Sequence, residues 1–208
     1  MDKKMNILAI GAHPDDIEIG CGGSLIKYSD KGHNIFLMLM TQGEEGGQPQ
    51  TRKAEQEKAA ALLGVQEIFW GEVVDTHLKV NLASIQIMEA VLAKVRPNFI
   101  FCPFSDDTHQ DHRHLAQITI SATRYVKNVL FYEGPTTQRF APDIYIDISE
   151  KIDRKIELLK AHESQMLKTN IEGVSIVDIA YSSANFRGIQ GRVKYAEAFC
   201  ALRLFINI

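Results

Sequence analysis

The sequence predicts an α/β fold with a doubly wound, mostly parallel sheet flanked by helices. Two observations support this fold class. Short apolar stretches alternate with stretches of helical periodicity along most of the 208 residues, as in sheets covered on both faces. Polar, histidine-rich segments directly follow two of the expected strands, where ligands bind in such sheets. Because the length falls within the range of one domain, we expect residues 1–208 to form a single domain.

The expected elements follow in order along the chain. A nearly continuous apolar strand over 5–12, a helix over 17–31 ending at Gly32, and a strand over 35–41 make one βαβ unit. The alternation then repeats through helix 51–63, strand 68–70, helix 82–95, strand 98–103, helix 115–125, and strands 129–132 and 143–148. Ser149 begins a long amphipathic helix through His162, and the tail YAEAFCALRLF forms another helix or an edge strand. This arrangement is Rossmann-like.

Composition restricts the class of partner and the location. A formal net charge of −3 offers no basic stripe for nucleic acid and favours a small molecule. Cys21, Cys102 and Cys200 are odd in number and lack CxxC spacing, so we expect reduced thiols and a cytoplasmic location. The apolar run of MDKKMNILAIGAHPDD is too short for a signal peptide, and no run could span a bilayer. The hydrophobic tail ALRLFINI suggests a homo-oligomer, from dimer to hexamer, unless it covers its own core.

The tetrapeptide His13-Pro14-Asp15-Asp16 stands at the end of the first expected strand. The fixed φ of Pro14 makes a tight turn that can direct His13 and Asp16 into one pocket, where a metal ion would meet an imidazole and a carboxylate. The alternative is that Asp15 and Asp16 only cap the following helix.

A second polar cluster follows the strand at 98–103. His109, His112 and His114 lie within THQDHRH, preceded by Asp106 and Asp107. A solvated polar loop is the alternative interpretation. Because both clusters follow strands, we expect them to lie at the same edge of the sheet.

Together the clusters offer two imidazoles and one carboxylate, which leave coordination positions free for water and substrate. A divalent ion held by His13, Asp16 and a histidine of THQDH indicates a metal-dependent hydrolase. The same ligand set also serves iron(II) oxygenases. Asp15 favours zinc and hydrolysis, because a carboxylate beside the ligand can accept a proton from the attacking water, and an oxygenase needs no such base.

The run Gly20-Cys21-Gly22-Gly23 lacks the GxGxxG spacing of a dinucleotide site, and no strand immediately precedes it. We expect a steric role, in which the glycines let the helix approach neighbouring backbone closely and Cys21 packs as a small residue.

Taken together, AHPDDIEIGCGGSL, TQGEEG with Arg52 and Glu55 after it, and THQDH resemble the LmbE-like, PIG-L-related family of zinc-dependent N-acetylglucosaminyl deacetylases. The segments AALLGV, FAPDIYIDIS, KAHESQ and KYAEAF extend the resemblance to the shorter bacterial members, such as bacillithiol-pathway deacetylases. The resemblance implies removal of an N-acetyl group from an N-acetylglucosamine-type conjugate, which gives acetate and an amino sugar.

Carried over residue by residue, the resemblance implies that His13, Asp16 and His112 bind Zn²⁺ and that Asp15 is the general base. A rival is an iron(II) enzyme on the same ligands. Another is a non-catalytic module that binds a sugar or nucleotide, which the presence of Asp15 disfavours.

The resemblance also assigns residues beside the metal. His109 becomes the second catalytic group, which stabilises the oxyanion, and Asp111 would favour its protonated form if the turn brings their side chains into contact. Gln110 stands where the family commonly has proline, so the loop is expected to be less rigid. Arg52 matches an arginine that holds sugar hydroxyls; a surface ion pair with Glu55 or Glu57 is the alternative.

The sequence leaves the aglycone open, and we expect loops 42–50 and 134–142 to decide it. Tyr195 and Arg139 are polar residues outside the motifs that could reach the pocket from their own chain or from a neighbour. Neither receives a role from the sequence.

Overall fold

Residues 4–206 are described by the computed structural model, and their strands form one seven-stranded sheet with the order β3-β2-β1-β4-β5-β7-β6. The strands are β1 (Asn6–Gly11), β2 (Asn34–Leu39), β3 (Glu67–Trp70), β4 (Phe99–Pro103), β5 (Val129–Tyr132), β6 (Ile144–Asp147) and β7 (Ala196–Arg203). The helices are α1 (Asp16–Asp30), α2 (Pro49–Leu63), α3 (Leu82–Val95), α4 (Gln110–Ala122), α5 (Ile152–Lys160) and α6 (Ile176–Gly191).

The sheet is parallel from β3 through β5, and β7 runs antiparallel to both of its neighbours, β5 and β6. The α/β, doubly wound and mostly parallel fold is therefore confirmed. The chain builds outward from β1 to β3 in one direction and then continues from β4 on the other side of β1. The loops that follow β1 and β4 diverge at this switch point, where open α/β sheets bind their ligands.

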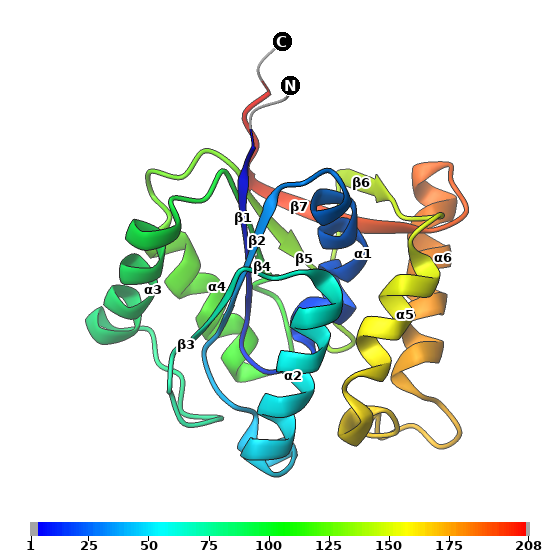
Figure 1. Ribbon diagram of the computed structural model, residues 1–208, viewed down its shortest axis with the longest axis horizontal. Helices are drawn as coiled ribbons and strands as arrows, with labels where there is room; N and C mark the ends of the chain where they lie inside the picture. Colours follow the sequence, from blue (N-terminus) through cyan, green and yellow to red (C-terminus); the bar gives the residue numbers. More distant parts are fainter. Residues whose placement is uncertain (1–3, 207–208) are drawn as a thin grey trace.

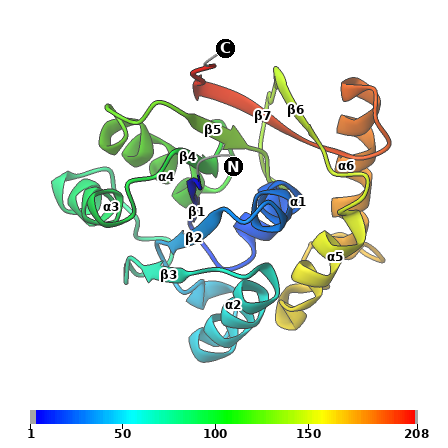
Figure 2. The same ribbon diagram turned by 45° about the horizontal axis from the view of Figure 1, so that its top comes forward.

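Two apolar layers cover the sheet. Figures 1 and 2 show α3 and α4 on one face and α1, α2 and α5 on the other. Along β1, Ile7 and Ala9 face the α1 layer, whereas Leu8 and Ile10 face the α3–α4 layer. A strand buried on both faces in this way has a continuous apolar run rather than an alternating one, which is why residues 5–12 are recognisable as a strand.

The C-terminal third departs from the sequence-based expectation. Helix α5 ends at Lys160 and is short, and the sequence pattern does not predict α6. The buried face of α6 consists of small residues, among them Ala180 and Ala184, together with Arg187. Phe186 and Ile189 are exposed, so the sequence of α6 has no apolar stripe. The tail forms β7, a strand that lies inside the sheet rather than at its edge. Residues 207–208 of ALRLFINI, like 1–3, lie outside the described residues.

Among the helices of residues 4–206, none combines the length and the apolar character that crossing a bilayer requires.

The glycines of α1 have a steric role, but the close approach is to side chains rather than to backbone. A Cβ at Gly20 would collide with the Tyr132 ring, and one at Gly23 would stand 2.9 Å from Ile148. The Tyr132 hydroxyl donates to the Ile10 carbonyl at 2.8 Å, so this buried ring cannot move freely. Cys21 is fully buried, as expected of a packing residue.

A pair of alanine substitutions in α1 tests this packing. Gly20→Ala should destabilise the protein by about 1–3 kcal/mol, the usual cost of overpacking a core. Gly22→Ala adds a Cβ whose nearest neighbour, Leu158, is at an ordinary 3.5 Å, so helix propensity should stabilise it by about 0.5–1 kcal/mol. Urea unfolding would measure both. Equal effects of the two substitutions would contradict the proposed contact.

Candidate metal and catalytic site

A cavity of about 900 Å³ opens at the carboxyl ends of the central strands. Its wall contains His13, Asp15 and Asp16 from the loop after β1 and the start of α1, together with His109 and His112 from the start of α4. The two histidine-rich segments therefore meet in space, as the fold class predicts. The alternative of an isolated, solvated polar loop at THQDHRH does not fit the burial of His112.

The turn at 13–16 holds its side chains by local hydrogen bonds. Asp16 Oδ2 accepts the backbone N–H groups of Ala12 and His13, each at 2.9 Å. Asp15 precedes α1 with φ of 96° and makes no side-chain capping bond, so helix capping is not its role. A non-glycine residue in this left-handed region stores backbone strain, which is characteristic of functional sites.

Asp16 lies close to both histidines that are expected to bind the metal with it. Asp16 Oδ1 lies 3.2 Å from His112 Nε2, and Asp16 Oδ2 lies 3.5 Å from His13 Nδ1. His13, His109 and His112 also offer nitrogen atoms that all lie within 4.8 Å of one another. All three expected ligands are buried. The structure therefore brings nitrogen and oxygen donors together at distances that one metal ion could bridge.

Each ligand histidine has a buried carboxylate behind it, on the ring nitrogen that faces away from the other ligands. Asp75 Oδ1 lies 2.9 Å from His13 Nε2, and Asp107 Oδ2 lies 3.2 Å from His112 Nδ1. Metal-binding histidines commonly have such partners, which fix the ring orientation and tautomer. The sequence alone gives Asp75 no role, although a carboxylate shortly after the end of β3 is a usable signal.

The electrostatics of the site fit a cation. Burial alone would raise the pKa values of Asp75 and Asp107, but the adjacent imidazoles of His13 and His112 hold both pKa values at about 2. Burial would likewise raise the pKa of Asp16, but the combined effect of His112 and His13 outweighs it and holds this pKa well below the ordinary value.

Several buried nitrogen and oxygen atoms of the site also lack a hydrogen-bond partner within residues 4–206. Both ring nitrogens of His112 and Oδ1 of Asp111 make no hydrogen bond of good geometry. Buried polar atoms are rarely left unsatisfied. A divalent ion bound by nitrogen and oxygen ligands suits this set of residues.

Asp15 is held by Arg52 at the edge of the cavity. Arg52 Nη2 lies 3.3 Å from Asp15 Oδ2, and the guanidinium donates to the carbonyls of Pro14 and Gly43. Burial raises the pKa of Asp15 to about 6, although Arg52 partly opposes this. The partner of Arg52 is thus Asp15 rather than Glu55 or Glu57. Arg52 lines the cavity, but only 5% of its surface is exposed.

A buried polar chain supports Asp15 from behind. Its backbone N–H donates to Gln56 Oε1 at 3.3 Å, and Gln56 Nε2 donates to Glu18 Oε1 at 2.7 Å. Glu18 also lies 3.4 Å from His162 Nε2, and both side chains are almost fully buried. The KAHESQ segment therefore supports the turn at 13–16 through His162.

His109 caps α4, and the Asp111 carboxylate does not make the expected contact with its ring. Its Nδ1 accepts the backbone N–H of Asp111 at 3.2 Å, while the Asp111 carboxylate accepts the N–H of Thr76 at 2.8 Å. Among the described residues, no hydrogen bond joins that carboxylate to the His109 ring. Burial lowers the pKa of His109, and the charges of His13 and His112 lower it further.

Gln110 occupies the first position of α4, which a proline could also occupy. Its amide donates to the Thr76 carbonyl at 2.7 Å, so a side-chain hydrogen bond anchors this turn where the family's proline would stiffen it.

The remaining candidates lie elsewhere. Arg139 is 86% exposed and pairs with Asp106, and Tyr195 packs against the α5–α6 layer. Neither lines the cavity. His114 Nδ1 lies 2.6 Å from the Leu78 carbonyl, away from the ligands. Parts of both loops expected to determine the aglycone, Glu45–Gly46 and Gly134–Thr137, do line the cavity.

Comparisons with known proteins agree with this geometry. The family model described as PIG-L, GlcNAc-PI de-N-acetylase, matches residues 8–123. The uncharacterized deacetylase YaiS of Escherichia coli is 34% identical over 173 residues, which cover 78% of this chain and 93% of that protein.

Two solved structures share the fold along nearly the whole chain. The conserved protein TT1542 from Thermus thermophilus has a TM-score of 0.87 at 26% identity and covers 98% of this chain and 97% of its own. The N,N'-diacetylchitobiose deacetylase from Pyrococcus horikoshii has a TM-score of 0.84 at 26% identity, and the match covers 95% of this chain and 84% of that protein.

Proposed function

The chain belongs to the PIG-L family of GlcNAc-PI de-N-acetylases, and on that premise we propose that it is a zinc-dependent hydrolase that removes the N-acetyl group from an N-acetylglucosamine-type conjugate. The observation that carries the proposal is the convergence of His13, Asp16 and His112 beside Asp15 in one cavity. The diacetylchitobiose deacetylase of Pyrococcus horikoshii acts on a substrate of this class.

His13, Asp16 and His112 would hold the metal ion. When bound, a divalent ion supplies Lewis-acid activation of water and of the amide carbonyl. Asp75 and Asp107 would keep the two imidazoles oriented through their outer nitrogens.

Asp15 would act as the general base and then as the general acid. It accepts a proton from the attacking water as the oxygen adds to the acetamide carbon, and it returns the proton to the amine nitrogen as the C–N bond breaks. Arg52 fixes its position. His109 would donate a hydrogen bond to the developing oxyanion from Nε2, because Nδ1 already accepts from Asp111.

We extend the same proposal to the whole chain. Residues 1–208 act as one deacetylase domain, located in the cytoplasm and assembled as a homo-oligomer. Cys21, Cys102 and Cys200 are all free thiols, which agrees with a reducing location.

Acetate release from a panel of N-acetylglucosamine conjugates tests the function. The protein would be depleted of metal and then restored with zinc or with iron(II), with and without oxygen. We expect zinc-restored, oxygen-independent release. Release without metal, or no release from any conjugate, would overturn the proposal.

The carboxylates behind the histidines provide a prediction that does not depend on turnover. Asp75→Asn and Asp107→Asn should each weaken zinc binding by about 10- to 100-fold, the usual effect of losing such a partner. A chromophoric chelator in competition would measure the affinity. Asp106→Asn is the matched control, because Asp106 precedes Asp107 but pairs with the exposed Arg139. Unchanged affinity in both variants would contradict the assignment.

A further inference from the structure

The cavity extends well beyond the candidate ligands, along α6 and the loop that precedes it. Its volume of about 900 Å³ is near the upper end of the roughly 300–1,000 Å³ typical of ligand pockets. A single acetylated sugar would leave much of that space unfilled. The polar residues Thr136, Lys168, Thr169 and Asn170 line this cavity as well. We use the name isoleucine arm for one set of its lining residues: Ile19, Pro135, Ile171, Ile176, Ile179 and Ser183.

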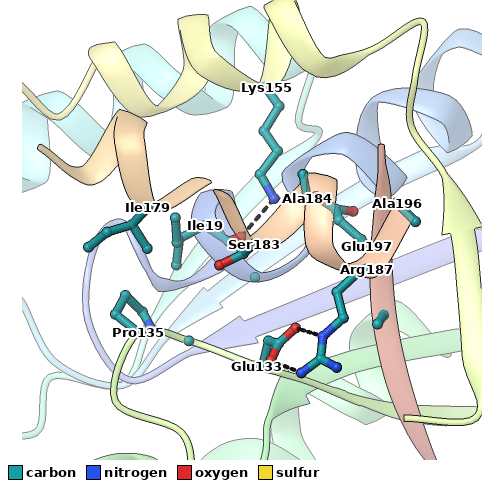
Figure 3. A pocket seen from close by; sticks show the side chains of 13 residues that line it. Ile19, Glu133, Pro135, Lys155, Ile179, Ser183, Ala184, Arg187, Ala196 and Glu197 are labelled. Atoms are coloured by element: carbon teal, nitrogen blue, oxygen red, sulfur yellow. Dashed lines mark hydrogen bonds and ion pairs between the residues drawn. The ribbon is translucent and has the colours of Figure 1, made fainter. Parts of the chain in front are cut away.

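A smaller recess of about 30 Å³ continues from the isoleucine arm toward the sheet. Figure 3 shows Ile19, Ile179 and Pro135 gathered on one side of this recess, with Ser183 beside them. The arm therefore presents mostly branched aliphatic carbon to whatever occupies the cavity.

The charged groups near the arm are already paired. Arg187 donates to both carboxylate oxygens of Glu133 at 2.6 Å (Figure 3). Lys155 donates to Glu197 at 2.6 Å and to the Ile19 carbonyl at 2.7 Å. Lys168, which also lines the cavity, donates to the Gly46 carbonyl. An anionic group in the arm would have to displace one of these contacts to gain a cation, and burying an unpaired charge is costly.

The lining also argues against a second sugar in the arm. No Trp, Tyr or Phe is among the described residues that line the cavity, so the arm has no aromatic face on which a pyranose ring could pack. A sugar hydroxyl placed against Ile176 or Ile179 would lose its hydrogen bonds to water without replacement.

Building on the proposed deacetylase function, we infer that the isoleucine arm binds an uncharged alkyl or aryl group carried by the glucosamine of the substrate. This group enters the cavity together with the sugar. It is attached either at the anomeric oxygen, as an aglycone, or at the amide, as an acyl chain longer than acetyl. In both cases the arm would make the same apolar contacts with the alkyl or aryl group.

Two substrate series distinguish the attachments. The first is N-acetylglucosamine glycosides with methyl, butyl, hexyl and octyl aglycones, and the second is methyl glucosaminides with N-acetyl, N-butanoyl, N-hexanoyl and N-octanoyl groups. All would be used below their critical micelle concentrations. Burial of one methylene is worth about a fourfold change in kcat/KM at most. In one series we expect kcat/KM to rise about two- to fourfold per methylene until the arm is filled.

Two exposed isoleucines make a matched pair of variants. Ile171 is 57% exposed and lines the arm, whereas Ile189 is 60% exposed on α6 and does not. Ile171→Ser should lower the octyl-to-methyl or octanoyl-to-acetyl ratio of kcat/KM by at least about threefold, and Ile189→Ser should leave it unchanged. Ser183→Leu, which narrows the arm from an exposed helical position, should lower the same ratio.

Binding of the amine product gives a readout without turnover. Calorimetry should find octyl glucosaminide bound more tightly than methyl glucosaminide, or octanoate more tightly than acetate. Flat kcat/KM in both series with acetate still released would overturn the inference and leave the deacetylase function standing. Absence of amide cleavage in every substrate would overturn the proposed function. The calorimetric comparison would still test the arm, because equal binding of the long-chain and short-chain ligands would contradict an alkyl-binding site.

Discussion

Asp15→Asn is expected to lower turnover by about 10³- to 10⁴-fold while zinc remains bound. General acid–base catalysis contributes about 10²- to 10⁴-fold in enzymes, and in the proposed mechanism one carboxylate serves both proton transfers. Asparagine is the informative replacement, because it keeps the size of the side chain and tolerates the positive φ at this position. The measurement combines steady-state acetate release with the zinc content of the purified variant.

The control for this experiment is a carboxylate at the same edge of the sheet with no proposed role. Asp106→Asn should retain turnover within a few-fold of the parent protein, because its partner is the exposed Arg139. Full activity in Asp15→Asn would eliminate Asp15 as the base. Loss of zinc in Asp15→Asn would instead show that Asp15 is a ligand or supports one.

His112→Ala is expected to abolish both metal binding and turnover. His112 supplies one of the three proposed ligands, and it lies against the carboxylates of Asp16 and Asp107. Its removal would leave two buried carboxylates without their shared partner. Elemental analysis after zinc loading should find less than about one tenth of the parent zinc content, since three-ligand sites tolerate the loss of a ligand poorly.

His114→Gln is the matched control, because this histidine lies two residues further along α4. Its ring contacts the Leu78 carbonyl, to which glutamine can also donate. The control should bind zinc and release acetate like the parent protein. Normal zinc content in His112→Ala would contradict the ligand set and direct attention to His109, whose ring nitrogen also lies within reach of His13.

The parts of the site that are predictable from the sequence are the ones that local chain geometry determines. His13, Asp15 and Asp16 occupy one turn after a buried strand, and His109 to His112 begin one helix. Their meeting follows from the fold class, because both segments follow strands that flank the switch point of the sheet.

The parts that escape prediction from the sequence depend on long-range contacts. Asp75 reaches His13 across 62 positions, and no local pattern indicates that pairing. The family resemblance implies that Arg52 contacts substrate, and no local pattern indicates its additional hydrogen bonds to the Pro14 and Gly43 carbonyls. Helix α6 is not recognisable because its buried face consists mainly of small residues, whose packing depends on how closely β6, β7 and α5 approach it.

The two walls of the cavity come from separate stretches of the chain. The proposed ligands and base lie within residues 8–123, the stretch that the family model matches. All residues of the isoleucine arm except Ile19 lie after that stretch. Mutations in the second stretch can therefore change which conjugate is accepted without altering the reacting groups. On this proposal, reaction and substrate selection are encoded in separate stretches of the chain.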